Sequence, residues 1–157
     1  MLPPSPQGVR ILRAQTADIP RIQEMVNAAY EKYIPRIGRA PAPMTTDYTT
    51  LLTTHDVFVV APVEGLEIIG SIVLRADDKT MKLNNVVVDP RAQGKGYGRV
   101  LLNCAEDWAR MKGCNEVALF TNVHMTENLK LYAKMGYDET ERKTEDGFER
   151  VYFRKSL

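Results

Sequence analysis

The sequence predicts an α/β domain of the α+β type, in which a mixed, mostly antiparallel central sheet of six to seven strands is flanked by about four helices. Three observations support this fold class. Short runs rich in β-branched residues alternate with segments whose apolar residues recur at helical spacing. Three of these runs follow one another across short turns, which is typical of an antiparallel meander. Two further runs flank Asp146-Gly147, a dipeptide typical of a tight hairpin.

The first half of the chain carries signals for one strand, two helices and the meander. An N-cap at Thr16 or Asp18 begins the first helix, with Pro20 in its first turn. Apolar residues then recur at helical spacing to about Tyr33, after which Pro35 is expected to break the helix and begin an irregular loop. The expected strands are residues 9–14, 57–61, 67–75 and 80–88, and a second helix is expected from residue 46 or 47 to residue 52.

In the second half, a helix, a strand, a second helix and a hairpin are expected in that order. Gly113 ends the first of these helices, and Gly136 closes the second at its C′ position. The expected elements are a helix from the glycine cluster to residue 111, a strand over 116–120, a helix over 126–135, and paired strands over 137–143 and 148–155. We expect one domain over residues 9–157, preceded by a frayed, proline-containing leader over residues 1–8.

Length and charge restrict the classes of function. The 157 residues are 44% hydrophobic and 26% charged, which is typical of a single soluble globular domain. A net charge of +1 produces no overall field that would attract nucleic acid or a membrane, and neither is an expected partner. The sequence lacks a signal peptide and an apolar stretch near the ~20 residues of a membrane span, so we expect a cytoplasmic protein. Two cysteines and two histidines without clustered spacing predict no metal site.

The sharpest local feature is a strand that runs into a turn with three glycines, after which a helix begins. Glycines let main-chain N–H groups approach a ligand, and the N-terminus of a helix adds unpaired N–H groups and a partial positive charge. Such a turn is a ready site for an anion. Its glycines and cations are Gly94, Gly96 and Gly98 with Arg91, Lys95 and Arg99. The alternative is a tight strand-to-helix connection with solvated basic residues, since the spacing matches neither a Walker A loop nor a dinucleotide fingerprint.

Residues 93–98, Gln-Gly-Lys-Gly-Tyr-Gly, resemble the Q/R-x-x-G-x-G/A signature of the GNAT superfamily of N-acetyltransferases. Residues 131–137, Leu-Tyr-Ala-Lys-Met-Gly-Tyr, resemble the L-Y-x-K-x-G-F/Y segment of the same family. The order of the expected elements also agrees, so the resemblance covers roughly residues 9 to 155. It implies a GNAT-like acyl-CoA N-acyltransferase fold, acetyl-CoA as co-substrate, and direct acetyl transfer to a primary amine of a small molecule or a protein.

The resemblance also implies roles for individual residues. Tyr132 occupies the family's position for the general acid that protonates the CoA thiolate, and an N–H near Val87 would stabilise the tetrahedral oxyanion. Asn128 lies one helical turn before Tyr132, so both side chains share a face. For Tyr132 the alternative is a core aromatic at helical spacing. The resemblance implies that the strand binds the pantetheine arm of the cofactor and that the turn binds its pyrophosphate. The implied cofactor-binding residues are Val86, Val87, Val88, Gln93, Gly94, Lys95, Gly96, Tyr97, Gly98, Arg99 and Asn128.

The sequence departs from the family pattern at two positions. The family often places a cofactor-contacting asparagine seven residues before the tyrosine, where this chain has Met125. Asn128 or Asn122 would then have to replace it. Some members place a glutamate on the strand before the glycine turn, as a general base, and this chain has Leu83 there.

No general base is therefore assigned. The proton of the amine is expected to leave through water held by Asn84, Asn85 or main-chain carbonyls, unless another segment supplies a base. His124, close in sequence to the tyrosine helix, is one such candidate. Cys104 lies on an apolar helix face, so we expect a buried structural thiol rather than a nucleophile.

The acceptor is expected to contact the loop between the first two helices and the final hairpin. Tyr30 and Tyr33 would wall its pocket, Arg36 or Arg39 would hold a carboxylate, and Asn84 would lie beside it. The alternative for this loop is a solvated basic segment tied down by its aromatic residues. Two functions stay open: an N-acetyltransferase, or a catalytically silent acyl-CoA-binding sensor or regulatory module. A homodimer through an exposed strand edge or the hairpin is also open.

Overall fold

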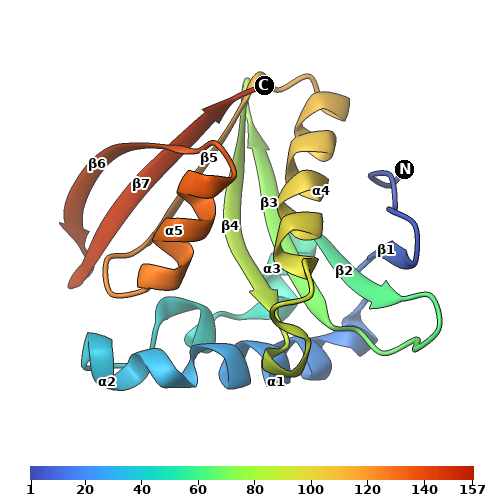
Figure 1. Ribbon diagram of the computed structural model, residues 1–157, viewed down its shortest axis with the longest axis horizontal. Helices are drawn as coiled ribbons and strands as arrows, with labels where there is room; N and C mark the ends of the chain where they lie inside the picture. The colour runs from blue at the N-terminus through green and yellow to red at the C-terminus, as the bar shows by residue number, and fades with distance from the viewer.

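The computed structural model describes residues 1–157 and contains one seven-stranded sheet with helices packed on both faces (Figure 1). The strands are β1 (Val9–Arg13), β2 (Asp56–Pro62), β3 (Gly70–Asp77), β4 (Thr80–Val88), β5 (Glu116–Asn122), β6 (Asp138–Glu145) and β7 (Phe148–Ser156). The helices are α1 (Ile19–Tyr30), α2 (Ile34–Ile37), α3 (Tyr48–Thr54), α4 (Tyr97–Met111) and α5 (Thr126–Lys134). The strand order is β1-β2-β3-β4-β5-β7-β6, and only β4 and β5 are parallel neighbours. The predicted fold class is confirmed.

The two faces of the sheet bury separate apolar clusters. Along β2, Phe58 and Val60 face the cluster under α4 and α5. Val57 and Val59 alternate with them and face the cluster under α1 and α3. Trp108 of α4 is fully buried and packs edge-on against Phe58, with ring centroids 5.0 Å apart. The core therefore holds α4 and α5 on one face and α1 and α3 on the other (Figure 1).

A β-bulge in β4 changes which face each of its side chains meets. Leu83 and Asn85 pair with adjacent residues of β3, so Asn84 between them is the extra residue of the bulge. Leu83 lies in the cluster on the α4 side, whereas Val87 lies in the cluster on the α1 side. Strict alternation would have placed both on one face. The bulge therefore exchanges the two faces of β4 at Asn84.

Strands β4 and β5 pair for only a short distance. Thr80–Leu83 pair in parallel with Glu116–Leu119, and the two strands do not pair beyond these residues. β4 continues alongside β3, while β5 continues alongside β7. The sheet therefore opens between residues 84–88 and residues 120–122, and α5 lies across this opening (Figure 1).

Most of the predicted elements are confirmed, including the meander β2-β3-β4 and the hairpin β6-β7. A two-residue loop joins β6 to β7, and its Asp146 (φ 52°) and Gly147 (φ 79°) both lie in the left-handed region. Such a loop matches the right-handed twist of the flanking strands. The strand predicted over 67–75 begins later, at Gly70.

The expectation that Pro35 ends the first helical segment in an irregular loop is wrong. α1 ends at Tyr30, but a 3₁₀ turn and helix α2 continue the chain to Ile37, with Pro35 in the first turn of α2. A proline in that position lacks only an N–H that no helical carbonyl would accept, so it begins a helix without loss. Gly38 (φ 89°) then ends α2 in the left-handed conformation.

Residues 1–8, expected as a frayed leader, contact β1 and the segment after β2. The N–H of Ile11 donates to Ser5 Oγ over 2.9 Å, and the N–H of Val63 donates to the Gly8 carbonyl over 3.0 Å. Pro3 is buried. These contacts hold the leader along one edge of the sheet.

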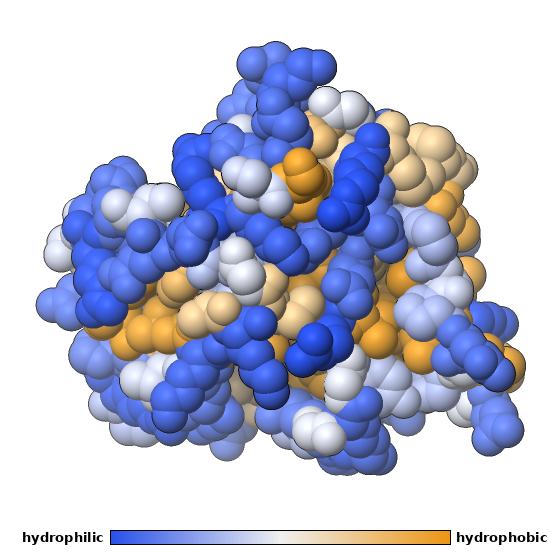
Figure 2. All heavy atoms as spheres, turned by 45° about the horizontal axis from the view of Figure 1, so that its top comes forward, coloured by the Kyte–Doolittle hydropathy of each residue, from blue (hydrophilic) through white to orange (hydrophobic).

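The surface is mostly hydrophilic. Figure 2 shows polar and charged side chains over most of one face, with apolar side chains between them in narrow bands. None of the helices has the length and apolar composition needed to cross a membrane. The large apolar side chains that are exposed are Met1, Leu2, Leu12, Ile34, Val63, Leu66, Met111 and Phe120.

Asp89, directly after β4, joins α1 to the start of the glycine turn. Its carboxylate accepts from the Arg91 N–H over 2.9 Å and pairs with the guanidinium groups of Arg21 and Arg91. Arg21 also donates through Nε to the Ile68 carbonyl over 3.0 Å. The side chain of Asp89 is buried, and its hydrogen bonds from Arg91 and Arg21 hold the pKa of the carboxyl well below its usual range.

We predict that Asp89→Asn lowers the free energy of unfolding by about 1.5–3 kcal/mol at pH 7, because charged hydrogen bonds are lost around a buried group. A carboxyl with a lowered folded pKa stabilises the fold above its unfolded pKa of about 4, and this stabilisation is lost as the pH falls toward the folded pKa. The difference between wild type and variant should therefore shrink from pH 7 to pH 3 in urea unfolding.

The matched control is Asp107→Asn, since Asp107 is half-exposed on α4 and pairs with Arg110 over 3.6 Å. Its free energy of unfolding should change by less than about 0.5 kcal/mol. A difference for Asp89→Asn that stays constant from pH 7 to pH 3 would contradict the assignment of the stabilisation to an ionised Asp89.

Candidate functional site

A cleft of about 480 Å³ lies at the end of β4, between the glycine turn with the start of α4 and the facing α1 and α5. We call it the turn cleft. Its lining residues are Ala29, Tyr30, Lys32, Tyr33, Val86, Val87, Val88, Gln93, Gly94, Gly96, Tyr97, Gly98, Arg99, Glu127, Asn128, Leu131, Tyr132 and Lys134. The structure thus brings together around one cleft all of the residues expected at the cofactor except Lys95, which does not line it.

The glycine turn presents main-chain N–H groups to this cleft. Gly94 (φ 80°) and Gly96 (φ 90°) lie in the left-handed region, which other residues rarely adopt. Gly96 is the N-cap of α4, and no side chain caps the first N–H groups of the helix. Gly98 and Arg99, in the first turn of α4, line the cleft. The unpaired N–H groups and the positive end of the helix dipole can bind an anion such as a phosphate there.

One of the three cations expected around the turn is engaged elsewhere. The Arg91 guanidinium lies 2.9 Å from the Asp89 carboxylate and 3.3 Å from that of Glu67. The interpretation of Arg91 as part of the anion site is therefore corrected, because an acidic residue just before the turn neutralises its charge. Lys95 and Arg99 form no salt bridge, so the free positive charge at the turn belongs to these two residues.

The end of β4 offers main-chain groups on the side that faces the opening. The Asp89 N–H donates to the Ile69 carbonyl of the neighbouring chain segment over 2.8 Å. In an antiparallel pair such bonds alternate, so the N–H and C=O groups of Val86 and Val88 point away from β3. The Tyr30 hydroxyl lies 3.1 Å from the Val86 carbonyl on that side. The exposed N–H groups beside Val87 are thus those of Val86 and Val88.

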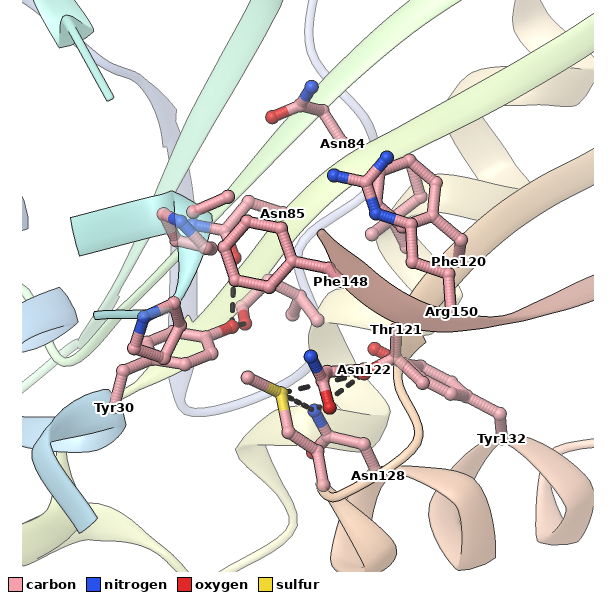
Figure 3. Close-up of a pocket in the computed structure, with 16 residues that line it drawn as sticks. Tyr30, Asn84, Asn85, Phe120, Thr121, Asn122, Asn128, Tyr132, Phe148 and Arg150 are labelled. Carbon is pink, nitrogen blue, oxygen red and sulfur yellow. Dashed lines mark hydrogen bonds between the residues drawn. The ribbon is translucent and has the colours of Figure 1, made fainter. Parts of the chain in front are cut away.

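A second cavity, of about 70 Å³, lies in the opening between β4 and β5 (Figure 3). We call it the inner cavity. Its lining residues are Tyr30, Pro41, Ala42, Pro43, Leu83, Asn84, Asn85, Val86, Phe120, Thr121, Asn122, Met125, Asn128, Tyr132, Phe148 and Arg150. Tyr30, Val86, Asn128 and Tyr132 line both cavities and form the boundary between them.

Tyr132 lies at this boundary with its ring in the core. It is 4% exposed and packs against Phe153 and Tyr137, with ring centroids 5.6 and 6.0 Å away. Burial raises the pKa of the phenol well above its usual value, and no hydrogen bond joins the hydroxyl to another protein group. The hydroxyl is thus protonated at neutral pH and free to donate a proton at the junction of the two cavities.

The neighbours of Tyr132 bear on the expected replacement for the family asparagine. Asn128 lines both cavities, and its Nδ2 donates to Thr121 Oγ1 over 3.4 Å. Asn122 lines only the inner cavity, where its Oδ1 accepts from the His124 N–H over 2.9 Å. The sulfur of Met125 lies 3.6 Å from Asn128 Nδ2. Of the two candidate asparagines, Asn128 is the one that reaches the turn cleft.

Asn84 and Asn85, adjacent in sequence, have different environments because of the bulge. Asn85 is buried; its Oδ1 accepts from the Tyr30 hydroxyl over 2.9 Å, and its Nδ2 donates to the Tyr48 hydroxyl over 3.0 Å. Burial raises the pKa of both tyrosines. Asn84 is exposed to the inner cavity and forms no hydrogen bond (Figure 3). Asn85 therefore supports the cavity wall, and Asn84 is the amide left free to hold water.

No carboxylate lines the inner cavity. Glu127 lines the turn cleft, but it accepts from the Tyr33 hydroxyl over 2.7 Å and from Arg36 over 2.9 Å. These hydrogen bonds, that of Tyr33 foremost, lower the pKa of Glu127 to about 2, which is too low for a general base. His124 lines neither cavity and lies 3.9 Å from Glu149. The structure brings no general base to the boundary.

The residues expected at the acceptor are only partly brought together. Tyr30 and Asn84 line the inner cavity, and Tyr30 and Tyr33 line the turn cleft. Arg36 lines neither and pairs with Glu127 over 2.9 Å. Arg39 lines neither; its guanidinium stacks 3.5 Å from the centre of the Phe148 ring and donates to the carbonyl at the tip of the β6-β7 hairpin. Arg39 therefore joins the segment after α2 to the hairpin.

Several residues that line the inner cavity were not among the predicted site residues. Phe120 on β5, and Phe148 and Arg150 on β7, point into it from the far side of the opening (Figure 3). In the sequence these residues belong to expected strands. They line a cavity because β4 and β5 stop pairing after Leu83 and Leu119. The prediction that Cys104 is a structural thiol is confirmed, since it is buried in the core and burial raises its pKa to about 12.

Comparison with known proteins agrees with this arrangement. An aminoglycoside N(6′)-acetyltransferase type 1 from Serratia marcescens is 31% identical over 75 residues, which are 48% of this chain and 47% of that protein. The match thus spans about half the length of that relative. An IAA acetyltransferase from Azospirillum brasilense is 28% identical over 124 residues, 78% of each protein.

Solved structures share the fold. A GNAT family acetyltransferase from Elizabethkingia anophelis with acetyl-CoA bound superposes with a TM-score of 0.71 at 21% identity, covering 97% of this chain and 100% of that one. The model of the acetyltransferase (GNAT) family matches residues 20–137, which include α1, the glycine turn and α5. With most of its length matched, the chain belongs to the acetyltransferase (GNAT) family.

Proposed function

We propose that this protein transfers the acetyl group of acetyl-CoA to a primary amine acceptor, with Tyr132 as the general acid. One observation carries the proposal: Tyr132, Asn128 and Val86 lie on the boundary between a cleft with an anion-binding end and a separate cavity in the sheet. A thioester entering from one side would meet an amine entering from the other. The acetyl-CoA bound in the Elizabethkingia relative supports acetyl-CoA as the co-substrate.

The residues of the turn cleft fit the parts of acetyl-CoA. The N–H groups of residues 94–99, with Lys95 and Arg99 nearby, would hold the pyrophosphate. The outward main-chain groups of Val86 and Val88 would pair with the amides of the pantetheine arm, as an added strand does. The arm would then end beside Tyr132 and Asn128.

The reaction forms a C–N bond and breaks the C–S bond of the thioester. The neutral amine attacks the acetyl carbon, and an outward N–H beside Val87 stabilises the oxyanion. Tyr132 gives its proton to the departing thiolate and is reprotonated from solvent. The proton of the amine passes to water, for which Asn84 offers a free amide, because no carboxylate lines the inner cavity.

The second candidate is a catalytically silent acyl-CoA-binding module. The lack of a carboxylate in the inner cavity favours it, since the amine must lose a proton before it attacks. The names of the relatives, an aminoglycoside N(6′)-acetyltransferase and an IAA acetyltransferase, favour the enzyme. Release of free CoA in the presence of a panel of amines separates the two candidates, because only the enzyme turns over.

Tyr132→Phe should lower kcat about 10–100-fold, because the thiolate then leaves without its proton donor. The dissociation constant for acetyl-CoA should stay within about twofold, since the hydroxyl forms no contact that shapes the cleft. The rate is measured by thiol release and the affinity by calorimetry. Tyr137→Phe is the matched control, because Tyr137 packs against the Tyr132 ring but lines neither cavity. Equal rates for wild type and Tyr132→Phe would remove Tyr132 from the mechanism.

Gly98→Val should weaken acetyl-CoA binding at least about tenfold, because the side chain would enter the turn cleft where N–H groups must approach a phosphate. A Cβ at Gly98 would meet only Leu131 Cδ2, at 3.6 Å, so the fold accommodates the change. The control is Asn103→Val, which places the same β-branched residue on the exposed side of α4. Calorimetric affinity equal to wild type in Gly98→Val would reject the turn as the phosphate site.

A further inference from the structure

The inner cavity contains one charged side chain, Arg150. Its side chain is 14% exposed, and its guanidinium lies over the Phe120 ring, 4.3 Å from the centroid. The nearest carboxylate oxygen is Oε1 of Glu145, at 3.6 Å, which is beyond hydrogen-bond distance. Arg150 therefore forms a salt bridge with Glu145 but no hydrogen bond to it, and its side chain lines the cavity (Figure 3).

No acidic side chain lines the inner cavity, and the one carboxylate paired with Arg150, that of Glu145, lies outside the lining. The other polar side chains of the lining are neutral: Tyr30, Asn84, Asn85, Thr121, Asn122, Asn128 and Tyr132. A guanidinium that is largely out of water and lacks a hydrogen-bonded partner is costly. A bound carboxylate would remove this cost by taking two parallel hydrogen bonds from the fork of the guanidinium. A second cation in the same cavity would raise the free-energy cost of burying the guanidinium.

The charge outside the cavity has the same sign. A groove of about 610 Å³ adjoins the inner cavity and shares Leu83, Asn84 and Phe120 with it. Its charged lining residues are Arg75, Lys82, Lys143 and Arg154, against Asp77 and Glu141, together with the titratable His55. Lys82, Lys143 and Arg154 pair with Asp77, Glu141 and Glu116. Arg75 is the one cation of this groove without a carboxylate partner, so the remaining charge along the approach is positive and favours anionic over polycationic ligands.

We infer that the acceptor is a small amine that carries a carboxylate, and that Arg150 binds this carboxylate. The inference rests on the proposed function. The carboxylate lies on the β7 side of the inner cavity, and the amine points to Tyr132 at the boundary with the turn cleft. Phe120 and Phe148 contact the hydrocarbon between the two groups. Polyamines and aminoglycosides, which carry several positive charges and no carboxylate, are excluded by Arg150.

The first test compares amines with and without a carboxylate. The panel pairs 4-aminobutyrate with butylamine, and phenylalanine with phenethylamine and phenylalanine amide, and adds spermidine and kanamycin as polycations. Release of free CoA from acetyl-CoA gives kcat/KM for each amine. The carboxylate-bearing member of at least one pair should exceed its uncharged or decarboxylated partners at least tenfold, and both polycations should be poorer than that member.

The second test changes Arg150 itself. Arg150→Gln should raise the KM of the best carboxylate-bearing acceptor at least tenfold, while the KM for acetyl-CoA and the rate with the decarboxylated partner stay within twofold. Arg150→Lys should recover part of the loss, because it keeps the charge but not the fork. Arg142→Gln is the control, since Arg142 lies on β6, pairs with Glu139 and lines none of these cavities. Thermal unfolding checks that all variants fold.

The outcomes separate the inference from the proposed function. Faster turnover of butylamine, phenethylamine or a polycation than of every carboxylate-bearing amine overturns the inference alone. So does an Arg150→Gln variant that loses activity equally with and without the carboxylate. Tight binding of acetyl-CoA without turnover of any amine overturns the proposed function, and the inference with it.

Discussion

The opening between β4 and β5 is the constraint on which the rest of the site depends. Parallel pairing ends after Leu83, and the bulge at Asn84 turns the following residues of β4 onto new faces. Val86 and Val88 keep main-chain groups without a strand partner, and the gap beside them becomes a cavity. α5 crosses this gap and carries Tyr132 into it. A fully paired sheet would have neither the free main-chain groups nor the cavity.

Charge is handled differently at the two ends of the site. At the glycine turn, positive charge comes from main-chain N–H groups and the helix dipole. Arg91 does not add to it, because its guanidinium pairs with Asp89. In the inner cavity a single guanidinium stands among neutral side chains. Two acidic residues are held by other side chains. Glu127, at the turn cleft, accepts a hydrogen bond from the Tyr33 hydroxyl, and Glu106, in the core, pairs with Lys155 at 2.9 Å. No carboxylate is therefore free at the inner cavity to take the proton of an amine.

Features that depend on neighbours in sequence could be predicted from the sequence. The hairpin follows from the backbone freedom of two turn residues, and the glycine turn from its spacing and the helix after it. Features that depend on distant segments could not be predicted. Nothing local distinguishes Asn84 from Asn85, because the register of β3 decides which of them is extra. The final hairpin was predicted to contact the acceptor, but not through which residues, because the positions of Phe148 and Arg150 depend on β7 lying beside β5.

The position of β7 also bears on how the protein is made. β7 follows β6 in the chain but lies between β5 and β6 in the sheet. During synthesis β5 therefore keeps an unpaired edge after β6 has emerged, and β6 has no neighbour to join. The same strand carries Phe148 and Arg150, the far wall of the inner cavity. Pairing of β7 thus covers an edge prone to wrong pairing and completes the wall of the inner cavity in the same step.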